Sequence, residues 1–476
     1  MQTILYFYQY LVFFYGIAFI LIITFLTLSS FIKGWSYKWR YTKKEDEILK
    51  ESPYAPGISI IAPAFNEETT IITNVRSLLT IDYPTFEVVI VNDGSTDKTL
   101  ELLINEFDLV ETPFAYIEKV QCQPFKGLFK STNPDYKKLT VVSKVNGGTK
   151  ADASNAGINV SAYDYFVCTD VDCILSRDSL LKMIQPVLNS SVQVIAVGAT
   201  MRMANSCEVD DEGIITRVRP PRGIIPRFQE LEYLRSYLIS KMGWSLVGLM
   251  PNVSGGIGLF DKSVVIEAGG YDSLSHAEDM DMLIRMITYM KNHNKPYKIS
   301  HVPVTTCWTE GPPNLFVLNK QRTRWGRGLL QFFIVHRKLL FNRHYGKVGL
   351  VMLPYLFIFE LLAPLIEFSG IAITIYFLFT NKVNFETAYL LLSFIFVFFV
   401  LISAITVVYD LVINKLYNRY REYVKLFSCA LIEIFIYHPF IIFFNVKGYI
   451  DFLFKQRFEW GAMKRQGVQV SQREEA

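Results

Sequence analysis

The sequence lacks the paired cysteines that an exported, disulfide-bonded protein carries. Its six cysteines are scattered and show no CxxC spacing, which favours reduced thiols in a cytosolic compartment. It also lacks a strong excess of positive charge, because the formal net charge is only +4. The basic residues lie beside apolar segments, where they set membrane topology instead of binding phosphates. We therefore expect no nucleic-acid partner.

Charged residues are missing from the first apolar segment. Residues 4–32 carry no charge, and a helix that spans a bilayer needs about 20 such residues. The segment also lacks the basic start and the small-residue cleavage site of a secretory signal peptide. Its basic cluster follows the segment, at Lys33, Lys38, Arg40, Lys43 and Lys44. Because basic residues stay on the cytosolic side, the sequence predicts an outward N-terminus and a cytosolic chain from residue 45 onward.

Three more apolar runs occupy the last third of the chain, at residues 348–380, 385–412 and 426–454. If the first two of these runs, 348–380 and 385–412, both span the membrane, the chain returns to the cytosol after them. The basic residues that follow the second run agree with this orientation. The third run contains Pro439, and the tail after it is basic. A straight span and a broken or re-entrant helix both remain open for this run, since proline kinks a helix and frees backbone groups.

Two glutamates lie within the first of these runs. Glu360 and Glu367 are seven residues apart, and therefore lie on one face of a helix. Ionisable groups in a span are costly, and they tend to line a cavity or a polymer path. The alternative is an interfacial helix whose glutamates lie among the lipid headgroups.

The middle of the chain has the pattern of a soluble α/β domain. Buried strands are predicted over residues 57–63, 86–91 and 163–169, with helices over 68–80 and 96–107 between them. This alternation predicts a doubly wound, mostly parallel sheet that binds ligands beyond the carboxyl ends of its strands.

Carboxylates follow three of these strands, and the last of them forms an Asp-x-Asp pair. Alternate residues on an extended segment project to one side, so Asp170 and Asp172 can both bind one hard divalent cation. Such a cation neutralises a leaving pyrophosphate, as sugar transfer from a nucleotide donor requires. Any single turn aspartate is a weak signal, because turns collect aspartate for structural reasons.

Seven short motifs stand in a fixed order along residues 57–330. They are Ala64-Phe-Asn-Glu67, Asn92-Asp-Gly-Ser95, Lys150-Ala-Asp152 with Asn155 and Gly157, Asp170-Val-Asp172, Ser254-Gly-Gly256, Glu278-Asp279 and Gln321-Arg-Thr-Arg324-Trp325. This ordered set resembles the family-two processive glycosyltransferases, which include the synthases of poly-N-acetylglucosamine, cellulose, chitin and hyaluronan. The flanking apolar runs match as well, and their small number suits the poly-N-acetylglucosamine branch.

The resemblance implies a GT-A fold and a role for each motif. It implies Asp279 as the catalytic base with Glu278 beside it, and Mg²⁺ or Mn²⁺ bound by Asp172 and Asp170. The residues implied to bind the donor are Glu67, Asp93, Lys150, Asp152, Asp170 and Arg324. The residues implied to bind the acceptor are Ser254, Gly255, Gln321 and Trp325. The family has threonine where Ala277 stands here, so a hydroxyl contact at this position is in doubt.

Each of these positions also has a structural interpretation. Asp93 can cap a helix, the acids at 278 and 279 can complement a helix dipole, and Arg324 with Trp325 can form a stack at the membrane interface. The ordered motifs favour the functional interpretation.

Several segments outside the motifs carry expectations of their own. We expect Ser95 to cap the following helix and residues 121–137 to form an inserted surface loop. Residues 202–227 are expected to form a loop over the active site, and residues 228–244 a helix along the membrane.

The sequence thus predicts four regions: a transmembrane helix with its basic stop (1–45), a cytosolic GT-A domain (46–330), interfacial and transmembrane helices (331–460) and a polar tail (461–476). The expected function is inverting, processive polymerisation of a UDP-sugar, best UDP-N-acetylglucosamine, in a bacterial inner membrane. Expected partners are the UDP-sugar, the growing polysaccharide, membrane lipids and a small membrane companion subunit. The alternatives are sugar transfer to a lipid carrier and a non-catalytic sensor of nucleotide sugar or polysaccharide.

Overall fold

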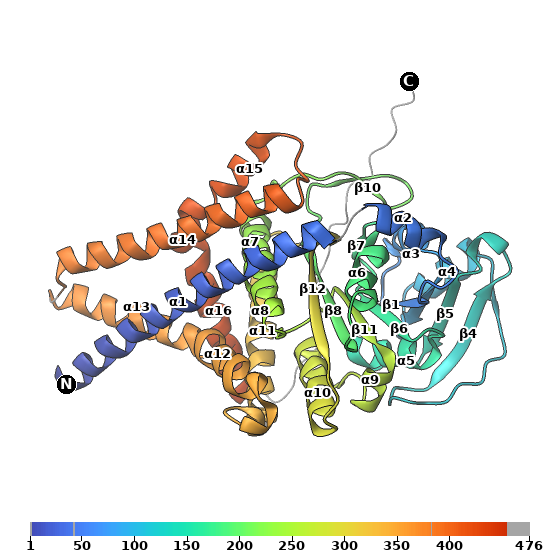
Figure 1. The fold of residues 1–476 in the computed structure, drawn as a ribbon, viewed down its shortest axis with the longest axis horizontal. Helices are drawn as coiled ribbons and strands as arrows, with labels where there is room; N and C mark the ends of the chain where they lie inside the picture. The colour runs from blue at the N-terminus through green and yellow to red at the C-terminus, as the bar shows by residue number, and fades with distance from the viewer. Residues whose placement is uncertain (1, 41–42, 382, 455–476) are drawn as a thin grey trace.

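A mixed β-sheet forms the centre of the structure, a computed structural model that describes residues 2–40, 43–381 and 383–454 (Figure 1). Within these residues the sheet has ten strands in the order β3-β4-β5-β2-β1-β6-β11-β8-β12-β7, and β9 and β10 form a separate hairpin. The strands are β1 Ile58–Ala64, β2 Phe86–Asn92, β3 Leu109–Glu111, β4 Phe125–Ser131, β5 Leu139–Lys144, β6 Tyr165–Thr169, β7 Ile174–Leu175, β8 Val194–Met203, β9 Glu208–Val209, β10 Ile215–Arg217, β11 Ile257–Asp261 and β12 Lys298–Thr309.

Helices cover the sheet and extend away from it. They are α1 Gln2–Arg40, α2 Lys43–Glu51, α3 Ile71–Leu79, α4 Thr99–Glu106, α5 Lys150–Val160, α6 Ser179–Leu188, α7 Ile224–Leu234, α8 Met242–Leu246, α9 Lys262–Glu267, α10 Glu278–Asn292, α11 Leu315–Val335, α12 Leu353–Leu356, α13 Ala363–Phe379, α14 Phe385–Ile413, α15 Tyr420–Phe427 and α16 Ala430–Phe454. Three π-helical segments lie at Arg235–Lys241, Val348–Met352 and Phe357–Leu361. Short 3₁₀ turns lie at Pro134–Tyr136, Arg337–Leu339 and Arg343–Tyr345.

The strands β5, β2, β1 and β6 are parallel neighbours at the centre of the sheet. Their side chains are buried at nearly every position instead of alternating, as expected of strands covered on both faces. Strand β11 runs antiparallel between β6 and β8. The arrangement is the GT-A fold predicted from the sequence. Because β1, β2 and β6 are parallel, the turns that carry Glu67, Asp93 and Asp170 meet at one edge of the sheet.

Two local expectations are wrong. Residues 121–137 are not simply an inserted loop, because strand β4 lies within them and pairs with both β3 and β5. Ser95 does not cap helix α4, which begins at Thr99. The Asp97 carboxylate accepts hydrogen bonds from the Thr99 backbone and side chain instead, while the Ser95 hydroxyl accepts one from the Asn66 backbone.

The chain between β8 and β11 is more ordered than the sequence suggests. Residues 202–227 contain the β9–β10 hairpin and the beginning of α7. The helix expected over 228–244 is present as α7, the π-helical segment and α8 in direct succession. This helical run packs against α1, where the backbone of Leu26 approaches Gly243.

Four helices in the described part of the chain are long and apolar enough to cross a membrane. They cover Tyr10–Lys38, Val348–Phe379, Ala388–Ile413 and Ala430–Phe454. Figure 1 shows α1, α13 and α14 extending to one side of the sheet domain, whereas α16 runs across their direction. The Tyr409 hydroxyl of α14 donates a hydrogen bond of 2.7 Å to the Ser30 carbonyl of α1, which ties these two helices together.

Helix α16 is one continuous helix despite Pro439, and it packs against α11 through two glycines. A side-chain carbon at Gly448 would lie 2.5 Å from the Thr323 carbonyl oxygen, and one at Gly326 would lie 2.8 Å from the Asn445 carbonyl oxygen. The backbones therefore touch at both glycines, and α16 is fixed along the helix that carries the Gln-x-x-Arg-Trp motif.

Glu360, in the π-helical segment Phe357–Leu361, is exposed, and Glu367, on α13, is partly buried. Together with Tyr15, His438 and Asn445 they line a cavity between α1, α13 and α16. The His438 Nε2 atom lies 3.0 Å from a Glu367 oxygen. The cavity alternative for these glutamates is the one that the helix packing supports.

Gly448→Val is expected to destabilise the protein, because its side chain overlaps the α11 backbone and forces the two helices apart. Overpacking of this kind typically costs about 1–3 kcal/mol. The measurement is thermal unfolding of the purified protein in detergent. Gly16→Val is the matched control, since no atom lies within 4 Å of the added carbon. Equal melting temperatures for the two variants would contradict the close packing.

Candidate active site

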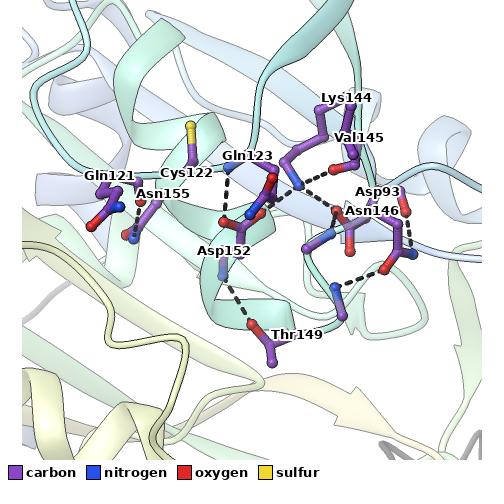
Figure 2. A network of polar contacts seen from close by, with 12 residues as sticks. Asp93, Gln121, Cys122, Gln123, Lys144, Val145, Asn146, Thr149, Asp152 and Asn155 are labelled. Atoms are coloured by element: carbon purple, nitrogen blue, oxygen red, sulfur yellow. Dashed lines mark hydrogen bonds and ion pairs between the residues drawn. The ribbon is translucent and has the colours of Figure 1, made fainter.

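The turn after β2 holds Asp93 in a buried network (Figure 2). Gly94 has φ +66°, and a side chain there would lie 2.8 Å from the Asn146 nitrogen, so the Asn-Asp-Gly-Ser motif requires its glycine. One Asp93 oxygen accepts a hydrogen bond of 3.0 Å from the Gly147 backbone. The Asn146 amide donates one of 2.7 Å to the Asp93 carbonyl. The two loops that follow β2 and β5 are thereby joined.

Lys144 connects two of the predicted donor-binding carboxylates. Its ammonium is fully buried, lies 2.5 Å from an Asp93 oxygen, and also forms an ion pair with Asp152. Figure 2 shows the lysine between the two acids. Asp152 further accepts a hydrogen bond of 2.9 Å from the Gln123 backbone. The sequence reasoning missed Lys144, although it stands at the end of a strand, two residues before Asn146.

A second group of predicted residues lies around the start of α5. Thr149 caps this helix by accepting from the Asp152 backbone. The Lys150 ammonium lies 2.5 Å from an Asp170 oxygen and donates a hydrogen bond of 2.6 Å to the Gly255 carbonyl. Burial alone lowers the pKa of Lys150, but the neighbouring Asp170 carboxylate raises it well above its ordinary value. Lys150 is therefore a charged link between the first and second halves of the domain.

Gly255 is the point on which these groups converge. A side-chain carbon there would lie 3.6 Å from the Lys150 ammonium, 3.8 Å from a Glu278 oxygen and 4.0 Å from the Asp279 Cβ. Its neighbour Ser254 lies near Tyr237, where it acts against the rise in the Tyr237 pKa that burial causes. The Ser-Gly-Gly motif thus lies between Lys150 and the two acids of α10.

The two acids occupy the first turn of α10. One Asp279 oxygen accepts a hydrogen bond of 2.8 Å from the Met280 backbone, and the other accepts one of 3.3 Å from the Asn252 amide. Burial and the neighbouring Asp279 raise the pKa of Glu278, while Lys150 and Arg324 act against this rise. Glu278 therefore tends to hold a proton more readily than an exposed glutamate.

Ala277 precedes these acids at the point where the family has threonine. Residue 277 is the N-cap of α10 and makes no side-chain capping bond. A side-chain carbon at Gly328 would lie 2.9 Å from the Ala277 Cβ, so α11 passes directly beside this position. The hydroxyl contact in doubt from the sequence is absent here.

The Gln-x-x-Arg-Trp motif lies on α11, as predicted, but its side chains diverge. Gln321 is buried and accepts a hydrogen bond of 3.1 Å from Gln229. The charge of Arg324 acts on Glu278. The guanidinium that stacks on Trp325 belongs to Arg322, with 4.4 Å to the ring centroid. Sequence reasoning missed this residue, which also forms an ion pair with Glu232.

The predicted metal-binding pair lies in the turn between β6 and β7. Oxygen atoms of Asp170 and Asp172 and the Cys173 sulfur lie within 4.8 Å of one another. Mg²⁺ and Mn²⁺ prefer carboxylate oxygen to thiol sulfur, so the two aspartates fit such a cation and the thiol contributes little. Glu67 lies after β1, where it accepts a hydrogen bond of 3.1 Å from Thr70.

Comparison with known proteins decides the family. The model for glycosyl transferase family 2 matches residues 59–120. The model for glycosyl transferase family group 2 matches residues 166–409, more than half of the 476 residues. The chain belongs to glycosyl transferase family group 2. The family predicted from the motifs is confirmed, and with it the glycosyltransferase class of enzyme and the GT-A domain.

Two relatives in this glycosyl transferase family are poly-beta-1,6-N-acetyl-D-glucosamine synthases. The protein of Staphylococcus epidermidis (strain ATCC 35984) is 28% identical over 281 residues, which are 59% of this chain and 56% of that protein. The protein of Staphylococcus aureus (strain COL) is 28% identical over 291 residues, 61% of this chain and 58% of that protein. The match therefore spans less than two thirds of either relative.

Among solved structures, the mannosyltransferase PcManGT from Pyrobaculum calidifontis, in complex with GDP-Man and Mn²⁺, aligns with a TM-score of 0.49 at 17% identity. The alignment covers 92% of this chain and 99% of that chain.

Lys144→Met is expected to destabilise the protein, because it leaves Asp93 and Asp152 buried without their shared cation. Removing one partner of a buried ion pair costs about 3–5 kcal/mol. Thermal unfolding in detergent measures the loss, and adding Asp152→Asn should recover part of it. The exposed Lys130, changed to Met, is the control. A Lys144→Met protein as stable as this control would contradict the network.

Proposed function

We propose that this protein is a membrane-embedded, inverting glycosyltransferase that extends a β-linked polysaccharide from a UDP-activated sugar, best UDP-N-acetylglucosamine. The proposal depends chiefly on one observation. The acids Glu278 and Asp279 face the Lys150–Asp170 pair across Gly255. The proposed base and the proposed diphosphate-binding lysine therefore lie on opposite sides of Gly255.

The chemistry follows from this arrangement. Asp279 accepts the proton of an acceptor hydroxyl, and the oxygen attacks the anomeric carbon from the side opposite the diphosphate. The bond between that carbon and the diphosphate oxygen breaks, and its electron pair leaves with UDP. One displacement inverts the anomeric centre, so an α-linked donor gives a β-linked product. The Asn252 amide and the Met280 backbone fix the two Asp279 oxygens for this role.

The donor side is assigned to the carboxylates at the sheet edge. Asp93 and Glu67 are proposed to bind the nucleoside, and Asp152 acts by holding Lys144 and Asp93 in place. Arg324 is proposed to bind the diphosphate. A divalent cation held by Asp170 and Asp172 neutralises the charge of the leaving diphosphate when it is bound. Lys150 supplies positive charge to the same place.

The choice of sugar and the processive mode are supported by other observations than the geometry around Gly255. The two staphylococcal relatives are named as poly-beta-1,6-N-acetyl-D-glucosamine synthases. Gln321 and Trp325 are proposed to bind the acceptor, with Ser254 and Gly255 at its reacting end. The cavity between the helices is lined mostly by apolar side chains, but Glu360, Glu367 and His438 also border it, which supports passage of a hydrophilic chain there. A small membrane companion subunit remains part of the proposal.

Transfer of a single sugar to a lipid carrier is the alternative within the same enzyme class. It uses the same donor site and differs in the product, which would be one glycolipid species instead of a high-mass polymer. A non-catalytic sensor would have no need of the base. The presence of Asp279 and of the Asp170–Asp172 pair favours an enzyme.

Asp279→Asn is expected to lower the rate of sugar transfer by about 10²–10⁴-fold, because an amide cannot accept the hydroxyl proton. UDP release and product mass are measured in nanodiscs with UDP-N-acetylglucosamine and Mg²⁺ or Mn²⁺. Chelation of the metal should abolish both signals. The exposed Asp211, changed to Asn, is the control.

Three outcomes bear on this proposal differently. Turnover only with another UDP-sugar would keep the mechanism and replace the donor. A single glycolipid product would overturn polymerisation. Wild-type activity equal to that of Asp279→Asn would overturn the role of the base.

The proposed orientation places the sheet domain in the cytosol and α16 along the membrane surface. The basic residues after α1, those after α14 and those in the tail then all lie on the cytosolic side. Three spans, α1, α13 and α14, suffice for this arrangement. The backbone contact of α16 with α11 at Gly326 and Gly448 supports a position at the membrane surface.

Single-cysteine labelling tests this orientation in a Cys122→Ser background, because the other five cysteines are buried. With a membrane-impermeant maleimide on intact cells, Thr380→Cys in the α13–α14 turn should react. Lys425→Cys and Leu453→Cys should react only after the membrane is opened, since both ends of α16 then lie inside. Labelling of Leu453→Cys on intact cells would show that α16 crosses the membrane.

A further inference from the structure

Lys241 is a buried lysine beside the proposed base. It ends the π-helical segment Arg235–Lys241, and its residue is only 7% exposed. In the described part of the chain, its ammonium lies over the Tyr237 ring, 4.4 Å from the centroid, and makes no ion pair or hydrogen bond. A lysine residue buried to this extent without an acid in contact is uncommon, which points to a partner that binds from outside the protein.

The surroundings of Lys241 belong to the acceptor side of the site. The Tyr237 ring that it contacts also stacks on His301, with 5.9 Å between centroids and 12° between planes. Burial raises the pKa of Tyr237 well above its ordinary value, and the nearby Ser254 side chain acts against this rise. Lys241 and Ser254, the first residue of the Ser-Gly-Gly motif, therefore both lie near the Tyr237 side chain.

The local backbone gives a second sign of function. A π-helical turn has poorer geometry than an α-helical turn and is frequently found at functional sites. Here it spans seven residues between two ordinary helices. It positions Tyr237 and Lys241 for their cation–ring contact.

Cations lie on both sides of the acid pair Glu278–Asp279. Glu278 is influenced by Lys150 and Arg324 on the donor side, whereas the charge acting on Lys241 is that of Asp279. His301, on β12, has a pKa well below its ordinary value because of burial and of Lys241, so its ring is neutral. Residues 21–30 of α1, which packs against this helix, carry no charge. Asp279 is thus the acid whose charge acts on Lys241.

We propose that Lys241 is an acceptor-binding residue of the reaction assigned above, whose ammonium donates a hydrogen bond to an oxygen of the terminal acceptor sugar. The inference rests on the proposed function of the same site. The contact holds the reacting hydroxyl beside Asp279, which takes its proton. The ligand class is a neutral saccharide rich in hydroxyl groups.

Lys241→Met is expected to raise the acceptor KM, or to lower kcat/KM for the acceptor, by about 10- to 100-fold, the usual effect of losing a hydrogen bond from a charged group. The probe is a β-1,6-linked N-acetylglucosamine oligosaccharide, varied at saturating UDP-N-acetylglucosamine in nanodiscs. The Kd for UDP-N-acetylglucosamine should change by less than about twofold. Lys241→Arg should recover most of the loss, because it retains the charge and the donor groups.

The pH profile separates a charge at Lys241 from a structural role. Burial lowers the pKa of Lys241 to about 8, with Asp279 acting against the decrease. The ammonium is therefore present below about pH 8 and is lost above it. Wild-type kcat/KM for the acceptor should fall above that pH, and Lys241→Arg should remain active there, since its guanidinium stays charged.

Lys295→Met is the matched control, because the Lys295 ammonium also lies over a tyrosine ring, at 5.0 Å from the Tyr289 centroid, but on an exposed surface. Acceptor kinetics of Lys241→Met equal to those of this control would overturn the inference. So would a loss of donor binding and thermal stability equal to the loss in acceptor use, which indicates a structural lysine.

A direct titration with the oligosaccharide covers the case in which the wild type does not turn over. Weaker oligosaccharide binding by Lys241→Met than by wild type would then support the acceptor contact while the polymerase assignment fails. Equal binding would overturn the contact itself.

Discussion

The charge of Arg202 has to be neutralised inside the protein, and much of the architecture follows from this requirement. Arg202 lies near the end of β8 and is 1% exposed. It forms ion pairs with Asp410 of α14 and with Glu230 of α7. A buried cation without such partners costs several kcal/mol. A single guanidinium therefore fixes the end of β8, helix α7 and the end of α14 to one another.

The active site is assembled where that junction places the helices against the sheet. The helix fixed by Glu230 continues into the segment that carries Tyr237 and Lys241, so the proposed acceptor side is positioned by the same contacts that join α7 to α14. The donor side comes from the turns after β1, β2 and β6, which parallel pairing brings together. Gly255 lies between the two, where a side-chain carbon would be in van der Waals contact with the acids of α10 and with Lys150.

The features predictable from sequence are those encoded by local pattern. Buried strands are apolar runs in the sequence and can be predicted from them. Motif residues such as Asp93, Asp170 and Asp279 lie at strand or helix ends, so the motifs predict where those elements end or begin. The missed features depend on partners distant in the chain. Lys144 binds Asp93, which lies 51 residues earlier in the chain. Arg322 binds Glu232, which lies 90 residues earlier. Strand β4 was missed because its exposed, lysine-containing sequence is stabilised by β3 and β5 on its two sides.

The ion pair between Arg202 and Asp410 has a consequence for how such proteins change over generations. A recombination event that exchanged the membrane helices for those of a distant relative would leave Arg202 without its acid, at a cost comparable to the whole stability of many domains. The sheet and the helix α14 must therefore be inherited together. Divergence is expected to proceed by paired changes at positions 202, 230 and 410, and more freely on the lipid-facing surfaces, where no buried charge links one segment to another.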